Sequence, residues 1–209
     1  MNEIKKDCIL ISSHLDNPYK EQVALSLLDF LGDKNLPIIF VGNYVIPPFI
    51  QKKSNWSLYV KENPTTLFKR VMVSNGKTAI DYGYAHLHQI GKGFLLAKSL
   101  GFNYVHHFNY DVVFKEEEFN KLIQKGKDNN PIVYEWGEFG LATNAFSIKV
   151  QDYLDSVEQN LDFYKNENPP NIINGWFCEV FFKWALKYSN INFSITNNIG
   201  YQSIVNSWE

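Results

Sequence analysis

One stretch, from Ala85 to Phe114, constrains the fold more than any other part of this 209-residue chain. Its first half carries apolar residues at helical spacing up to Leu100, and Gly101 follows where a glycine commonly ends a helix. Strand-forming residues come next, and a single carboxylate, Asp111, stands where the predicted strand ends. A helix followed by an apolar strand is the repeating unit of α/β proteins with parallel sheets.

Asp111 is a candidate site residue because of its place in this pattern. Ligands of open α/β sheets bind at the carboxyl ends of the strands, so an acid carried there by an apolar strand is well placed to bind one. Aspartate is also common in turns and caps, and that role is the alternative.

The rest of the chain extends the same alternation. Strands are predicted at 8–12, 37–41, 56–60, 132–134, 145–148 and 191–195, and helices at 17–31, 116–125, 151–164 and 176–188. The segment 135–143 is predicted to be a polar bend. The early strand–helix–strand order favours parallel pairing through right-handed crossovers. Since no repeat or linker interrupts the order, we predict one α/β domain over residues 1–209, with helices flanking a mostly parallel sheet.

Composition excludes several classes of function. The net charge of −2 and the scattered basic residues argue against nucleic acid as a partner, since binding to a phosphate backbone needs clustered Lys and Arg. No apolar run approaches the length that spans a bilayer, and no signal-type apolar region follows the N-terminus. Cys8 and Cys178 both stand among apolar residues, which favours two buried thiols in a reducing compartment. We therefore expect a cytoplasmic protein without a transmembrane segment.

Five segments follow one another in a distinctive order. A first strand ends in SSH at 12–14, a third ends before ENP at 62–64, and a helix carries YGYAHLHQIGKG at 82–93. A strand then closes at FNYD (108–111), and a late helix reads WFCEVFFKW (176–184). In order and spacing, over roughly 8–186, the chain resembles the nucleotide-sugar-dependent glycosyltransferases of the GT-A fold. The resemblance implies a UDP- or GDP-linked sugar donor and a glycan, lipid-linked or other hydroxyl acceptor.

The resemblance also implies a divalent metal ion. In that family the fourth core strand ends in a DxD motif, whose last acid binds the cation that holds the donor diphosphate. Here the motif reads Asn109-Tyr110-Asp111, so Asp111 is the expected ligand of Mn²⁺ or Mg²⁺, with Asn109 and Tyr110 beside the donor. One carboxylate, completed by phosphate oxygens and waters, is an ordinary shell for Mg²⁺. Asn109 could add a carbonyl oxygen, order a bound water or bond the ribose.

Further donor contacts are implied at the ends of the first and third strands and at the start of the central helix. They are Ser12, Ser13, His14, Asn63, Tyr82, His86 and Gln89. Each place has a simpler alternative. The residues at 12–14 would cap the following helix, Asn63 would be the extended residue before a proline, and His86 would merely pack.

Glu179 is the expected acceptor base. It stands in an aromatic segment, where a charge is costly unless it is used or paired, and inverting members of the family carry such an acid at the start of a late helix. The alternative is an ion pair with the lysine four residues on. Glu135 and Glu138 are other candidate acids, and Trp136 or Trp176 would stack on an acceptor sugar.

Two rival functions stay open. A sugar-phosphate nucleotidyltransferase shares the architecture, but it would carry a glycine-rich basic loop after the first strand, where this chain has SSHLDNP. A non-catalytic nucleotide- or sugar-binding module is the other rival, because Asn109 replaces the first acid of the metal motif.

Overall fold

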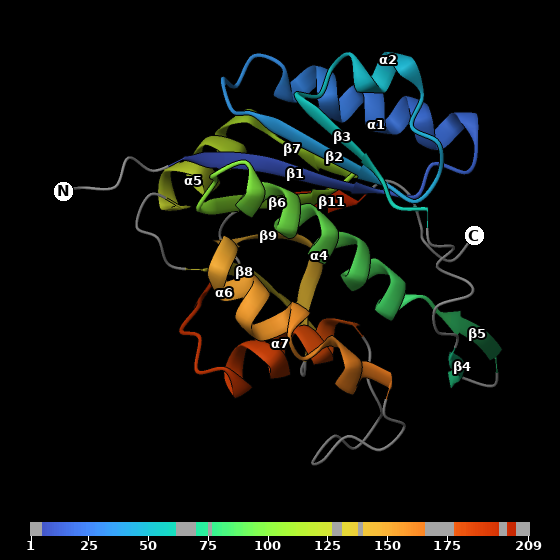
Figure 1. The fold of residues 1–209 in the computed structure, drawn as a ribbon, viewed down its shortest axis with the longest axis vertical. Coiled ribbons are helices and arrows are strands. Elements are labelled where there is room, and N and C mark those ends of the chain that lie inside the picture. The colour runs from blue at the N-terminus through green and yellow to red at the C-terminus, as the bar shows by residue number, and fades with distance from the viewer. Residues whose placement is uncertain are drawn as a thin grey trace.

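The computed structural model describes residues 6–61, 70–74, 77–126, 131–137, 140–165, 178–196 and 200–203. A seven-stranded sheet in the order β10-β8-β9-β6-β1-β2-β3 forms its centre (Figure 1). Its strands are β1 (Asp7–Ser13), β2 (Ile38–Gly42), β3 (Trp56–Tyr59), β6 (Tyr104–Asn109), β8 (Ile132–Trp136), β9 (Gly140–Lys149) and β10 (Ser194–Ile195). The strands β6, β1, β2 and β3 run parallel, while β9 is antiparallel to both β6 and β8. The expectation of an α/β protein with a mostly parallel sheet is confirmed.

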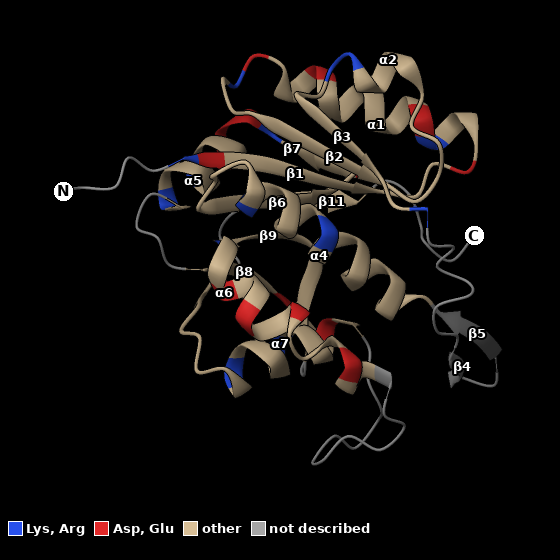
Figure 2. Cartoon of the chain, viewed as in Figure 1, with Lys and Arg blue, Asp and Glu red and all other residues tan. Residues whose placement is uncertain are grey.

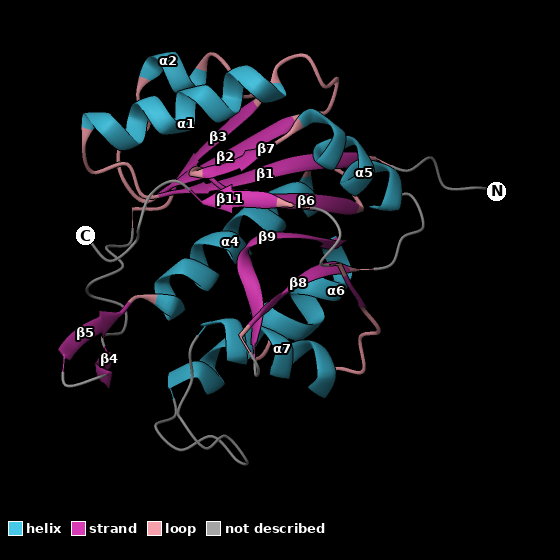
Figure 3. Ribbon diagram, turned by 180° about the vertical axis from the view of Figure 1, so that it is seen from behind, coloured by secondary structure: helices cyan, strands magenta, loops and turns pink. Residues whose placement is uncertain are grey.

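Helices cover both faces of this sheet (Figures 1 and 3). One face carries α1 (Pro18–Leu31), α2 (Pro48–Gln51) and α5 (Glu116–Gly126), and the other carries α4 (Gly83–Ser99), α6 (Val150–Tyr153) and α7 (Cys178–Tyr188). Because alternate strand residues point to opposite faces, β1, β2, β6, β8 and β9 each supply side chains to two separate apolar cores. Ile9 and Ile11 face the α1 side, while Cys8 and Leu10 face the α4 side. This double burial explains why β1 is continuously apolar from Cys8 to Ile11.

The predicted helix boundaries have local causes. Asn17 caps α1, since its Oδ1 accepts a hydrogen bond of 3.0 Å from the backbone N–H of Lys20. Gly101 follows α4 with φ of +79°, a left-handed conformation that glycine adopts without strain. Close packing fixes where α4 lies. A Cβ on Gly93 would be 2.5 Å from Leu10 Cδ1, so the missing side chain lets α4 approach β1.

Three predicted elements differ from the structure. The bend expected at 135–143 is largely strand, because β8 continues to Trp136 and β9 begins at Gly140, with Trp136 paired to Gly140. The helix expected at 151–164 is broken into α6, a π-helical turn (Leu154–Glu158) and a 3₁₀ turn (Leu161–Lys165). The last predicted strand shortens to the two residues of β10.

Two antiparallel pairs were not predicted. The strands β4 (Arg70–Ser74) and β5 (Lys77–Asp81) form a hairpin that leads into α4 and stands out from the body of the molecule (Figure 1). Near the C-terminus, β11 (Tyr201–Ser203) pairs with β7 (Val112–Phe114), which directly follows the metal-motif segment. A segment far along the chain thus returns to the end of β6.

Charged residues lie mainly on the helices and loops, and the strands of the central sheet carry few of them (Figure 2). Cys8 is buried and Cys178 is partly buried, and both are free thiols. Within the described part of the chain, no helix has the length and apolar character needed to cross a membrane.

Candidate active site

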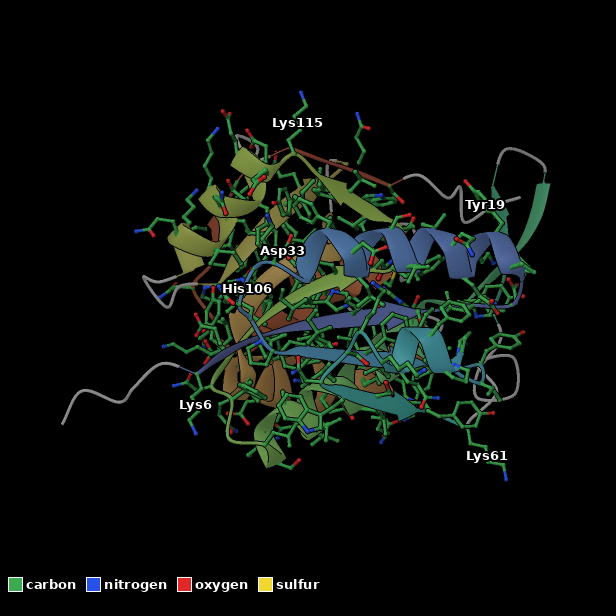
Figure 4. The ribbon with its side chains drawn as sticks, turned by 90° about the horizontal axis from the view of Figure 1, so that it is seen from above. Lys6, Tyr19, Asp33, Lys61, His106 and Lys115 are labelled. Atoms are coloured by element: carbon green, nitrogen blue, oxygen red, sulfur yellow. The ribbon has the colours of Figure 1, made fainter. Side chains whose placement is uncertain are left out.

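The candidate site lies at the edge of the sheet where the parallel strands end. Figure 4 shows this edge on the side of Lys61, which follows β3, and of Tyr19, at the start of α1, while Lys6, which precedes β1, lies on the opposite side. The strands β1 and β6 are neighbours, and Ser12 is paired with Asn109 in their register. Residues separated by almost a hundred positions therefore meet at this edge.

Asp111 is buried at this edge. Asp111 is only 6% exposed. Of the Asp, Glu, Lys and Arg side chains that the structure describes, it is the only one that is buried. It lies in the tight turn between β6 and β7, and its Oδ2 accepts a hydrogen bond from the hydroxyl of Ser203 in β11. Burying a carboxylate costs free energy unless it is hydrogen-bonded or paired, and the Ser203 hydroxyl supplies one such bond from a distant strand.

A chain of three side chains forms the floor of the site. Ser12 Oγ lies 2.9 Å from His107 Nε2 and donates a 2.8 Å hydrogen bond to Asn109 Oδ1. Ser12 and His107 are buried, whereas Asn109 is partly exposed. Burial holds the pKa of His107 well below its usual value, so the ring is neutral at neutral pH.

His86 comes from the first turn of α4 and faces this floor. Its ring centroid lies 6.4 Å from that of His107, and it is hydrogen-bonded to the backbone of Thr143 in β9. Burial lowers the pKa of His86 to about 4, against the opposing effect of that hydrogen bond. Both histidines are therefore neutral hydrogen-bonding groups rather than cations.

Gln89 and Ser13 join the elements of the site to one another. The Gln89 amide donates hydrogen bonds to the backbone oxygens of Ser13, at 2.8 Å, and of Val41, at 2.9 Å. Ser13 Oγ donates to the same Val41 oxygen, at 3.0 Å. These contacts attach α4 to the ends of β1 and β2, and the expected contact of Gln89 and Ser13 with a donor stays a prediction.

His14 lies at the rim, half-exposed, beside the loop that follows β2. Its Nδ1 accepts a 2.9 Å hydrogen bond from the Asn43 amide, its ring packs edge-on against Tyr44, and its Nε2 lies 3.4 Å from Asp16 Oδ2. Burial lowers the pKa of His14 more than the Asp16 charge raises it. Tyr110 packs into the core on the α1 face, so its side chain and that of Asn109 lie on opposite faces.

Glu179 approaches from the other side of the site, in the first turn of α7. A Cβ on Gly140 would lie 2.9 Å from Glu179 Cβ and 3.0 Å from the Trp136 ring, so this glycine lets α7 close onto the start of β9. Trp136 itself is 46% exposed, and Tyr82, just before α4, is 47% exposed. An exposed aromatic ring near a carboxylate, as Trp136 is near Glu179, is a surface on which a sugar could stack.

Tyr201, which sequence reasoning missed, lies within electrostatic reach of both carboxylates. Burial first, and then the charges of Asp111 and Glu179, raise its pKa to about 12, so the hydroxyl stays protonated. That hydroxyl donates a 2.6 Å hydrogen bond to Asn144 Oδ1 in β9, and the ring packs edge-on against Tyr134. No periodic pattern marks a three-residue strand such as β11, so the sequence held no signal for it.

The residues fit a hard divalent cation that would be coordinated mainly by phosphate oxygens and waters, with a single protein carboxylate. Among the described residues, no group of three His, Cys, Asp or Glu side chains gathers that could bind a metal ion by itself. The buried carboxylate of Asp111, with a hydroxyl beside it, is the kind of single anchor on which Mg²⁺ or Mn²⁺ binds together with phosphate oxygens and waters. Asn63 and Trp176 lie outside the described residues, so their expected roles stay predictions.

Two cavities of about 470 and 540 Å³ lie elsewhere, at the amino-terminal edge of the sheet. One is lined by Lys34, Glu116 and neighbouring residues, and the other by Asp7, Trp56 and Phe102 among others. Neither includes a residue of the site described above.

Comparisons with known proteins bear on the fold. No protein-family profile matches the sequence, and no curated protein matches it. A protein assigned as a nucleotide-diphospho-sugar transferase, from Desulfovibrio desulfuricans G20, superposes with a TM-score of 0.55 at 8% identity, over 92% of this chain and 80% of its own. A glycosyltransferase involved in the glycosylation of the major capsid of PBCV-1 superposes with a TM-score of 0.52 at 11% identity, over 96% of both chains. The chain therefore has a GT-A-like fold, as its motif order predicts.

Proposed function

We propose that this protein is a glycosyltransferase that moves a sugar from a UDP- or GDP-linked donor to a hydroxyl group of a glycan or lipid-linked acceptor. The observation that carries the proposal is the buried carboxylate of Asp111 at the carboxyl edge of a GT-A-like sheet. Ligands of open α/β sheets bind at this edge, and a carboxylate placed there is the kind of group that binds a hard divalent cation.

The donor side of the reaction needs help for the leaving group. When the bond between the sugar and the diphosphate breaks, negative charge grows on a phosphate oxygen. A divalent ion held by Asp111 would supply the countercharge when bound. Neutral His86 and Asn109 would offer hydrogen bonds to the hydroxyl and phosphate groups of the donor without adding negative charge, and Ser12 would hold Asn109 in place.

The acceptor side needs a base and a place for the sugar. Glu179 would take the proton of the acceptor hydroxyl as that oxygen attacks the anomeric carbon, a role that contributes about 10²–10⁴-fold to a rate. The exposed ring of Trp136, beside the same glycine as Glu179, would stack on the acceptor. Tyr201 stays protonated, so it would position groups rather than act as a base.

The test is transfer and hydrolysis of UDP- and GDP-linked sugars, with Mn²⁺ or Mg²⁺ and a panel of glycan and lipid-linked acceptors. We expect Asp111→Asn to abolish turnover with the fold retained, while Asp33→Asn, the same change at an exposed position outside the site, leaves turnover unchanged. We expect Glu179→Gln to lower transfer about 10²–10⁴-fold with donor binding intact. Loss of donor binding in Glu179→Gln would instead show a structural role.

A binding module without activity is the second candidate, and one observation favours it. Asn109 occupies the place of the first acid of the metal motif. If the protein binds UDP- or GDP-sugars, but neither transfers nor hydrolyses them with any acceptor in the panel, the module is the correct function.

A further inference from the structure

The side chain of Asn109 has a defined orientation at the end of β6. Its Oδ1 accepts the hydroxyl hydrogen of Ser12 at 2.8 Å, so the carbonyl end of the amide points back into the protein. Ser12 has a single hydroxyl hydrogen, and this bond uses it. Its other close contact, 2.9 Å to His107 Nε2, must therefore be a bond that the imidazole donates and Ser12 accepts.

The histidine at the base of this chain keeps the arrangement fixed. His107 is fully buried, and its other ring nitrogen, Nδ1, has no hydrogen-bond partner among the described residues. A neutral ring with its hydrogen on Nε2 satisfies Ser12 and leaves only a lone pair on Nδ1. The opposite tautomer would leave Ser12 with one hydrogen for two acceptors, His107 Nε2 and Asn109 Oδ1.

The outward end of Asn109 is consequently an N–H₂ group. The residue is partly exposed, and no described residue accepts a hydrogen bond from its Nδ2. Two N–H donors are thus presented at the position two residues before Asp111. An amide nitrogen cannot coordinate a cation, whereas it donates well to an anionic oxygen.

We propose that Asn109 is a hydrogen-bond donor to a phosphate oxygen of the bound diphosphate, rather than a ligand of the metal ion, and that Ser12 and His107 are positioning residues that hold it in this orientation. This inference rests on the proposed function for the identity of the natural ligand. It implies that the site retains part of its affinity for a pyrophosphate group when no divalent ion is present.

The test uses inorganic pyrophosphate as the probe, so that neither base nor sugar contributes. Binding to the full chain is measured by calorimetry in EDTA and in Mg²⁺, and by the shift of the Asn109 side-chain amide in ¹⁵N-resolved NMR spectra. The variants are Asn109→Asp, which keeps the acceptor for Ser12 and removes the donor, and Asn120→Asp, the same change at an exposed position on α5. Ser12→Ala, which frees the Asn109 amide to rotate, is the third variant.

We expect Asn109→Asp to weaken binding of pyrophosphate in EDTA by at least about 10–100-fold, because a charge-assisted hydrogen bond is lost and the new carboxylate repels the anion. Asn120→Asp should leave binding unchanged. Adding Mg²⁺ should raise the affinity for pyrophosphate by a larger factor in Asn109→Asp than in wild type. The affinity of Ser12→Ala for pyrophosphate in EDTA should lie between those of wild type and Asn109→Asp. The ¹⁵N shifts of His107 should show hydrogen on Nε2.

Three results would overturn the inference: wild type that binds pyrophosphate only with Mg²⁺, Asn109→Asp that binds as well as wild type in EDTA, or His107 with its hydrogen on Nδ1. Failure of the proposed function is a separate outcome. Pyrophosphate binding with the expected variant effects, but no turnover of sugar nucleotides, would leave Asn109 as a phosphate donor and remove the transferase assignment. Turnover of sugar nucleotides, with Asn109→Asp binding pyrophosphate as well as wild type in EDTA, would support the transferase and overturn the role of Asn109.

Discussion

The contact between α4 and the sheet can be tested with two alanine substitutions in the same helix. Gly91 and Gly93 lie two positions apart on α4, so replacing either by alanine gives the same gain in helix propensity, about 1 kcal/mol. Their surroundings differ. A Cβ at position 93 would lie 2.5 and 2.8 Å from the methyl groups of Leu10 and 3.1 Å from Val41 Cγ2, all in the buried core.

The three atoms nearest to a Cβ at position 91 would all belong to the carboxylate of Glu158, the first of them Oε2 at 1.9 Å. This carboxylate ends a flexible, partly exposed side chain, and its Oε2 has no hydrogen-bond partner among the described residues, so it can swing into water. Overpacking a core costs about 1–3 kcal/mol, so we expect Gly93→Ala to be less stable than Gly91→Ala by about 2 kcal/mol. For a chain of this size that is a difference in Tm of about 4–8 °C.

Thermal unfolding followed by calorimetry, with urea unfolding as a check on the free energy, measures this difference. Because the propensity gain is common to both variants, their difference isolates the packing of α4 on β1 and β2. Equal stability of the two variants, or the reverse order, would refute the close approach of this helix to the sheet. It would also remove the support for the position of His86, which α4 carries into the site.

Other substitutions test separate parts of the structure. Burial raises the pKa of Glu158 above 4.5, so wild type loses stability as the pH rises from that value through the raised pKa; Glu158→Gln should lack this loss in unfolding measured against pH. Tyr201→Phe removes the hydrogen bond to Asn144 and should cost about 1 kcal/mol in urea unfolding, and no cost would mean that β11 does not close over the site. Asn17→Ala removes the bond to the Lys20 amide and should cost about 1 kcal/mol, whereas Asn17→Gly should cost only a few tenths.

Much of the fold follows from local sequence. The apolar runs that form β1, β2 and β6 are buried on both faces, so their strand character is visible without knowledge of their partners. Asn17 and Gly101 mark helix ends by their own conformational preferences. The position of Asp111 at the end of a core strand follows from the same runs.

The contacts that complete the site depend on residues distant in sequence. Ser203 reaches Asp111 across 92 positions from a strand of three residues, and Ser12 reaches Asn109 across 97. Neither pairing has a periodic signal, because each depends on register rather than on composition. The strand character of Glu135 and Trp136 was missed for a related reason: both are exposed at the end of β8, so they resemble loop residues.

The charge of the site explains why a donor at Asn109 matters for function. His86 and His107 are neutral, and Asn109 stands where the DxD motif has its first acid, so on the proposed function Asp111 would be the carboxylate that faces the diphosphate. A second acid at the end of β6 would repel a diphosphate strongly unless a cation lay between them, because charges in a partly buried site are poorly screened. With an amide in that place the repulsion is smaller and a hydrogen bond is gained. On the proposed function, an asparagine at position 109 would therefore weaken binding of the metal ion and strengthen direct binding of phosphate.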